Sequence, residues 1–273
     1  MTEPTVNSLP RNHQDQRVTQ ARVIRSEWTK LRTVPSSAWT LLVTVALIVG
    51  FGAIYAAIRV TRPPHDPAAL ASFDATAVSL AGVQLAEIAV GILGALLFTG
   101  EYATGTIRTS FAAVPRRLPM LWGKAIGFAI AVLTLTVPAT FAAFVVGQSI
   151  LSSGHLDTTL GHPGTARAVL GAALYLTAVG LLGLGLGALL RSTAGAIGAL
   201  FGLLFAPQIL VGFLPSSLSD HIYGYLPVPA GVAITSVRPD PTSLAPWTGF
   251  GVFCLYTAIL MGLAAWRLRN RDA

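Results

Sequence analysis

Residues 100–124 read GEYATGTIRTSFAAVPRRLPMLWGK and form the longest polar, basic segment between two apolar runs of this chain. Within it, residues 104–114 contain no proline and one glycine, Gly105, so they are compatible with a short helix. Pro115 ends that helix, because proline lacks an N–H and clashes with the preceding turn. The chain is therefore expected to leave a membrane here, form a short helix and return, which exposes a docking element on the cytoplasmic side.

The composition indicates a polytopic membrane protein. Of 273 residues, 53% are hydrophobic and 11% are charged, and the mean hydropathy is +0.66. A soluble domain carries roughly 25% charged residues. The net charge of +7 comes from basic residues that flank apolar runs, so it indicates membrane orientation and not nucleic-acid binding. The single cysteine, Cys254, allows no disulfide within the chain.

The N-terminal part divides into two segments. Residues 1–17 are polar, lack periodicity and are expected to be disordered. Residues 18–34 place apolar side chains at helical spacing on one face, with basic side chains around the rest. Such a helix is expected to lie in the membrane interface, and the alternative is a soluble helix that packs on a partner. The residues expected to anchor it are Arg22, Arg25, Trp28, Lys30 and Arg32.

Six apolar runs follow, and each can supply the ~20 residues that a spanning helix needs. We expect an all-α fold with transmembrane helices at 37–58, 77–99, 119–151, 166–190, 194–214 and 246–266, followed by a tail at 267–273. Residues 216–245 form the longest outer segment. Within it, residues 223–237 are too apolar for a plain loop and too short to span, so they predict re-entrant or surface-lying helical pieces.

The distribution of lysine and arginine predicts that both termini are cytoplasmic. With the N-terminus inside, 14 of the 18 basic residues fall in inner segments, and only Arg59, Arg62, Arg167 and Arg238 fall outside. An excess of Lys and Arg in short cytoplasmic segments is the usual orientation signal.

Polar residues at membrane depth are the candidate transport residues. Glu87 lies inside the second apolar run with Gln84 one turn away, and Gln208 lies beside Pro207 in the fifth. An intramembrane ionisable residue indicates a functional site, and the alternative for Glu87 is a carboxyl that faces water or a neighbouring helix.

Glycines in the fourth and fifth runs predict a close helix pair, because GxxxG spacing lets two backbones approach. The runs are joined by three residues, so they form a tight hairpin. The glycines expected at the contact are Gly183, Gly187, Gly198 and Gly202.

Motifs for catalysis or nucleotide binding are absent from the sequence. A P-loop needs G-x-x-x-x-G-K-[ST], but Lys30 precedes Leu31 and Lys124 precedes Ala125. The sequence has no HExxH or GxSxG motif. His155, Asp157 and His162 share a short loop and are expected to be solvated, not metal ligands. The chain is thus expected to be no enzyme and to bind no cofactor or metal itself.

Two stretches resemble a known family, the ABC transporter permeases of the type-2 export class. The sequence RSEWTKLRT at 25–33 resembles the elbow helix before that family's first span. The segment at 100–125 resembles its first cytoplasmic loop, in which a Glu ends the second helix, a Gly-Thr follows, and a P-x-R-type turn precedes a Lys that opens the third. The resemblance covers nearly the whole chain after about residue 18.

The resemblance implies that the loop is a coupling helix that docks on a separate ATPase subunit, which holds ATP and Mg. It also implies a second permease, identical or different, and a substrate path along the interface, mainly beside helices 1, 2 and 5, in a plasma-membrane exporter. The residues expected to couple to the ATPase are Glu101, Thr104, Gly105, Thr106, Arg108, Ser110, Arg116 and Arg117. An ion-driven transporter that uses Glu87 and a non-transporting scaffold remain as alternatives.

Overall fold

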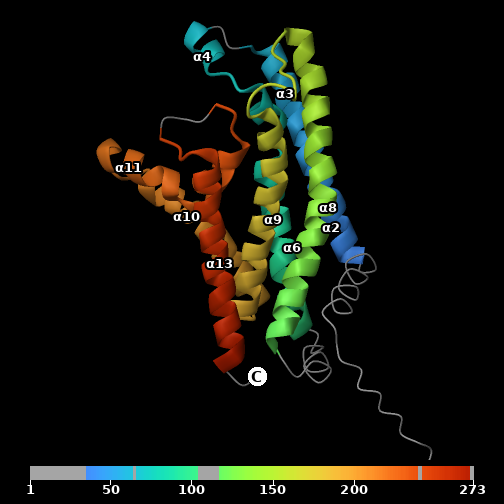
Figure 1. The fold of residues 1–273 in the computed structure, drawn as a ribbon, viewed down its shortest axis with the longest axis vertical. Helices are drawn as coiled ribbons and strands as arrows, with labels where there is room; N and C mark the ends of the chain where they lie inside the picture. Colours follow the sequence, from blue (N-terminus) through green and yellow to red (C-terminus); the bar gives the residue numbers. More distant parts are fainter. Residues whose placement is uncertain (1–34, 64–65, 104–116, 239–241, 271–273) are drawn as a thin grey trace, which may run out of the picture.

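The computed structural model describes residues 35–63, 66–103, 117–238 and 242–270, and this part of the chain contains helices and no strand (Figure 1). It includes six helices that are long and apolar enough to cross a membrane, which confirms the predicted fold class. They are Trp39–Thr61, Val83–Gly100, Leu118–Gly154, Thr165–Leu190, Thr193–Val211 and Pro246–Asn270. The interfacial helix expected at 18–34 lies outside the described residues.

Two of the spans are built from more than one helical piece. The first comprises α2 (Pro35–Ala46), the π-helical turn η1 (Leu47–Phe51) and α3 (Gly52–Thr61). The others are α6 (Val83–Ala103), α8 (Arg117–Leu151) with η2 (Ser152–Gly154), α9 (Thr165–Leu190), α10 (Thr193–Val211) and α13 (Pro246–Asn270). Short helices α4 (Pro67–Ala71) and α5 (Ala75–Ser79) connect the first two spans.

The second span begins later than the sequence predicts. The apolar run suggests a start near residue 77, but α5 ends at Ser79 and α6 begins at Val83. The break lets Gly82 approach the first span so closely that a Cβ there would lie 2.2 Å from the Leu47 carbonyl oxygen. Apolar periodicity cannot reveal such a contact, because it depends on two segments that are distant in sequence.

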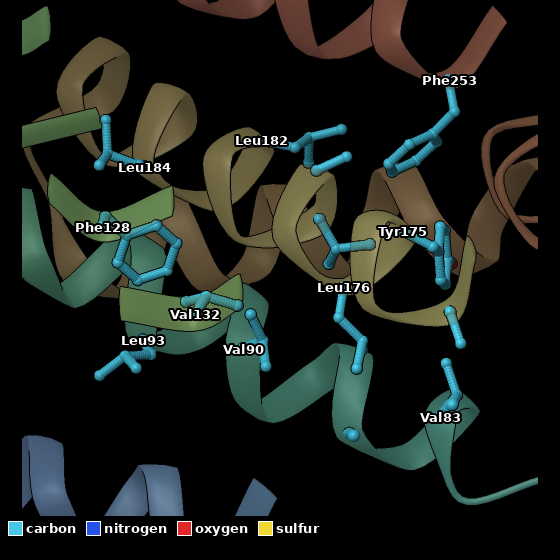
Figure 2. Packing of buried hydrophobic residues seen from close by; sticks show 14 of the residues in the cluster. Val83, Val90, Leu93, Phe128, Val132, Tyr175, Leu176, Leu182, Leu184 and Phe253 are labelled. Carbon is cyan, nitrogen blue, oxygen red and sulfur yellow. The ribbon is translucent and has the colours of Figure 1, made fainter. Parts of the chain in front are cut away.

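Helix α9 is the centre of the bundle. Its apolar window is 83% buried, against 22% for the first span and for α10. It contacts α6, α8, α10 and α13, and in Figure 1 it runs between α13 and the pair α6–α8. Figure 2 shows its Leu182 and Leu184 within the cluster that also contains Phe128 of α8 and Phe253 of α13.

Gly183 and Gly187 of α9 pack on α6 and not on α10, which corrects the predicted helix pair. A Cβ at Gly183 would lie 2.1 Å from the Gly91 oxygen, and a Cβ at Gly187 would lie 2.6 Å from the Ala95 oxygen. By contrast, no atom lies within 4 Å of a Cβ placed at Gly198 or Gly202. The reason is that α6 presents small residues to α9, whereas the GxxxG face of α10 points to open space.

The described part of the connection from α10 to α13 contains short helical pieces, as the sequence predicts. These are α11 (Ser216–Ile222), η3 (Tyr223–Tyr225), α12 (Pro227–Val232) and η4 (Ala233–Thr235). Helix α12 packs against α13, and η4 packs against α9. Helix α11 projects from the bundle in Figure 1.

We name the two ends of the bundle by what they carry. The α5 end holds α4, α5, η2 and the start of α9, and the tail end holds the last turn of α13 and the α9–α10 turn (Figure 1). The described basic residues separate between them. Arg59, Arg62, Arg167 and Arg238 lie at the α5 end, and Lys124, Arg191, Arg267 and Arg269 lie toward the tail end.

Candidate functional site

A cleft opens at the α5 end. Two cavities of about 800 and about 630 Å³ share four lining residues, so they are parts of one hollow, which we call the α5 cleft. The shared residues are Ser72, Ala77, Ala81 and Gln84. Volumes of this size are typical of small-molecule sites.

The smaller cavity lies between the first span and α5. One wall carries Phe51, Tyr55 and Arg59, which follow one another at four-residue intervals along one helical face. The opposite wall includes Phe73 and Asp74. This half of the cleft is therefore aromatic with a cationic edge.

The larger cavity lies between α5 and the segment that precedes α13. Its polar lining consists of hydroxyls, one amide and one guanidinium, provided by Ser72, Gln84, Tyr223, Thr235, Ser236, Arg238 and Ser243. Pro229, Val232 and Ala233 add apolar surface. The mixed lining suits an amphipathic molecule.

Asp74 joins the two walls of the cleft. Its Oδ1 accepts hydrogen bonds from the backbone N–H groups of Thr76 (2.9 Å) and Ala77 (3.0 Å), which caps α5. Its Oδ2 accepts from the N–H groups of Val237 (2.9 Å) and Arg238 (3.1 Å). An Asp before a short apolar run signals a helix cap, but the sequence gives no sign of the second pair of bonds.

Two further polar residues hold this end together. Gln148 of α8, 8% exposed, donates to the Ala75 oxygen at 3.1 Å and to the Ser79 Oγ at 2.9 Å. Arg167 at the start of α9 donates to the Ser236 oxygen at 2.9 Å. Together with Asp74, these contacts fix α5 against α8 and fix the segment before α13 against α9.

Of the three polar residues predicted to lie along a substrate path, the structure brings only Gln84 to the cleft. Gln84 is exposed and lines both cavities. Gln208 lies on α10 and donates to the Leu204 oxygen of its own helix at 2.9 Å. Glu87 is 2% exposed, one turn below Gln84.

Glu87 belongs to a buried polar contact at the junction of four helices. The hydroxyl of Tyr175 on α9 donates a hydrogen bond to Glu87 Oε2 on α6. The ring centroid of Tyr175 lies 5.2 Å from that of Phe253 on α13, with the planes tilted by 56°, and Figure 2 shows both side chains. On α12, a Cβ at Gly231 would lie 2.3 Å from Tyr175 Cε2. The geometry places the Glu87 carboxyl against a neighbouring helix, and its predicted role in transport stays a prediction.

The predicted docking loop lies largely outside the described residues. This holds for Thr104, Gly105, Thr106, Arg108, Ser110 and Arg116, and also for the interfacial residues Arg22, Arg25, Trp28, Lys30 and Arg32. The backbone of Glu101 lies within α6, which ends at Ala103, and Arg117 begins α8. The loop therefore connects two long helices directly.

The tail end of α6 is tied to the α9–α10 turn. The hydroxyl of Thr193 donates to the Thr99 hydroxyl at 3.1 Å. The guanidinium of Arg191 lies 5.4 Å from the ring centroid of Tyr102. Arg191 has φ 56°, the left-handed conformation that ends α9. These contacts join α6 to α9 and α10 at this end.

Metal ligands are not grouped in the part of the chain that the structure describes. No three His, Cys, Asp or Glu residues there are placed to hold an ion. His155 and Asp157 are exposed in the loop before α9.

The six apolar helices indicate a polytopic membrane protein. Comparison with protein families gives the more specific result: the model for "ABC-2 family transporter protein" matches residues 23–273. The chain belongs to this family. No curated protein matches it.

Proposed function

We propose that this chain is the permease subunit of an ATP-driven exporter, coupled to a separate ATPase subunit. The match to the ABC-2 transporter family over residues 23–273 carries the proposal. It is supported by the absence of a P-loop from the sequence, because a transporter of this family without its own nucleotide site needs ATP hydrolysis from a partner.

The ATPase docks on the loop between α6 and α8 in this proposal. The loop joins the ends of α6 and α8, which run through the membrane. A push on it moves both helices, whereas the α9–α10 turn contains only Arg191 and Ser192 and is too short to fill a groove. Arg116 and Arg117 hold the loop at the membrane surface, since each basic residue near anionic lipid contributes about 1 kcal/mol.

The α5 end faces outward in this proposal, and both termini are cytoplasmic in the plasma membrane. The excess of basic residues in the tail-end segments supports this orientation. The α5 cleft then opens to the outside, where an exporter releases its cargo. A second permease, identical or different, completes the path beside the open face of α10 and the first span, whose windows are only 22% buried.

The ion-driven alternative has less support. It requires an ionisable group that exchanges ions with water on each side in turn. Glu87 is 2% exposed and hydrogen-bonded to Tyr175, which favours a role in holding α6 to α9.

Complex formation tests the proposal. The tagged chain is expressed in its native cells, extracted in mild detergent and analysed by size-exclusion chromatography with mass measurement, and any P-loop ATPase that elutes with it is identified by mass spectrometry. We expect one assembly with equal numbers of permease and ATPase chains, and ATP hydrolysis only when both are present. Glu101→Ala should weaken the assembly, and Asp157→Ala, a matched change at the other end, should not. A chain that elutes without the ATPase would contradict the proposal.

A further inference from the structure

The smaller half of the α5 cleft contains an ordered ladder of side chains. The Phe51 and Tyr55 rings stack with centroids 6.4 Å apart and planes 7° apart. The Arg59 guanidinium lies 5.0 Å from the Tyr55 centroid, and its Nη2 donates to the Tyr55 hydroxyl at 2.6 Å. At 1.5 Å per residue, the ladder extends about 12 Å along the helix. We call this cavity the aromatic slot.

The slot is rigid on its far side. A Cβ at Gly52 would lie 2.3 Å from the Ser79 oxygen, so the first span is seated directly on α5. Gln148 binds the Ala75 oxygen and the Ser79 hydroxyl, and Leu151 packs with Val78 beneath the slot. Preformed walls reduce the entropy lost when a ligand binds.

The charge available in the slot is positive. Arg59 Nε is buried and has no hydrogen-bond partner among the described residues. The one carboxylate in the lining, Asp74, already accepts four backbone N–H bonds. The charge of Asp74 is therefore largely engaged by these bonds, whereas the Arg59 guanidinium lines the slot and makes no ion pair with the described residues.

We propose that the aromatic slot binds an amphipathic organic anion, with its acidic group at Arg59 and its apolar body along Tyr55, Phe51 and Phe73. The length of the ladder matches a chain of roughly ten carbons, and its aromatic rings offer apolar surface with little conformational freedom to lose. The bound molecule is either exported cargo or an anionic lipid of the bilayer. Its assignment as cargo rests on the transport function proposed above, but binding itself does not.

Binding is measured with a fluorescent pair of probes, dansylamino-undecanoic acid and its uncharged carboxamide. The protein is placed in nanodiscs of phosphatidylcholine, and energy transfer from tryptophan to dansyl reports probe at the protein. We expect the acid to bind more tightly than the amide. Arg59→Gln should lower the affinity for the acid roughly tenfold or more and leave the affinity for the amide unchanged. Hydrogen bonds to charged groups contribute enough binding free energy for such a difference.

Two variants control this measurement. Arg62→Gln removes the same charge from the exposed end of α3, outside the slot, and should leave both probes unchanged. Ala77→Phe fills the cavity and should lower the affinity for both probes. Equal effects of Arg59→Gln and Arg62→Gln, or equal affinity of the two probes for the unmodified chain, would overturn the proposal.

Phosphatidylglycerol in the nanodiscs identifies the source of the anion. Competition with the acid probe assigns the slot to a bilayer lipid, and no competition assigns it to a free amphipathic acid such as cargo. Both outcomes support an anion site. The binding measurement needs no ATPase, so the two experiments are independent. If the acid probe does not bind, the proposal of a permease subunit is unaffected. If the chain does not assemble with an ATPase, the proposal of an anion site is unaffected.

Discussion

At the scale of single residues, Tyr175 combines a buried hydrogen bond to Glu87 with packing against Phe253. The Tyr175 side chain is fully buried, so its hydroxyl has no access to water as an alternative partner. The carboxyl of Glu87 satisfies it, and the same ring packs on Phe253. The transport role predicted for Glu87 therefore stands beside a structural role in holding α6 to α9.

We expect Glu87→Ala to destabilise the protein by about 1–3 kcal/mol, because it leaves a buried hydroxyl without a partner. Glu87→Gln keeps an acceptor and should cost less. The measurement is thermal unfolding in detergent, with Tyr175→Phe added to complete a double-mutant cycle. The double variant should lose less stability than the sum of the single variants. Additive losses would show that the two side chains do not interact.

Asp74 leads to a second prediction. Asp74→Asn replaces one acceptor oxygen by an amide group, so either the α5 cap or the bonds to Val237 and Arg238 are lost. The expected loss of stability is about 1–2 kcal/mol. Asp157→Asn, an exposed acid at the same end, is the matched control and should change the melting temperature little. Equal melting of both variants would mean that Asp74 does not hold the cleft walls.

At the scale of helices, small residues decide which spans approach closely. GxxxG spacing on α9 indicates a close contact but does not name the partner. The partner is α6, because its Gly91 and Ala95 leave room at the crossing, and α10 turns its own glycines away. Spacing within one helix contains no information on the facing helix.

Paired substitutions test this arrangement. Gly183→Ala should lower the yield of folded protein strongly, since its Cβ would lie 2.1 Å from a backbone oxygen that cannot move aside easily. Gly198→Ala, the matched change in α10, should leave both yield and melting of the single chain unchanged. Similar losses for both would indicate that α10 also packs closely through its glycines.

At the scale of the whole molecule, the fold class and the number of spans could be predicted from the sequence. A run of about twenty apolar residues is recognised by its average hydropathy, so a few polar residues within it do not hide it. The break at residues 80–82, the π-helical turn and the walls of the cleft could not be predicted. Each depends on contacts such as Gly82 with Leu47, or Asp74 with Val237, that join segments far apart in sequence.

Orientation is tested by cysteine labelling. Cys254 is replaced by Ala, and single cysteines are placed at Ser110, Asp157, Asp220 and Asp272. In intact cells, an impermeant thiol reagent should label only the positions 157 and 220, because the basic inner segments stay in the cytoplasm. Labelling at position 110 from outside would invert the proposed orientation.

The central claim is that energy from ATP enters this chain through the loop between α6 and α8. ATP hydrolysis by the complex of permease and ATPase in nanodiscs tests it most directly, compared with hydrolysis by the ATPase alone. Ser110→Pro breaks the predicted loop helix, because proline clashes with the preceding turn. Asp272→Pro is the control in the C-terminal tail. We predict that the complex with Ser110→Pro hydrolyses ATP at the rate of the ATPase alone, whereas Asp272→Pro keeps the stimulation by the permease. Full stimulation with proline at position 110 would contradict the account, since the energy would then enter elsewhere.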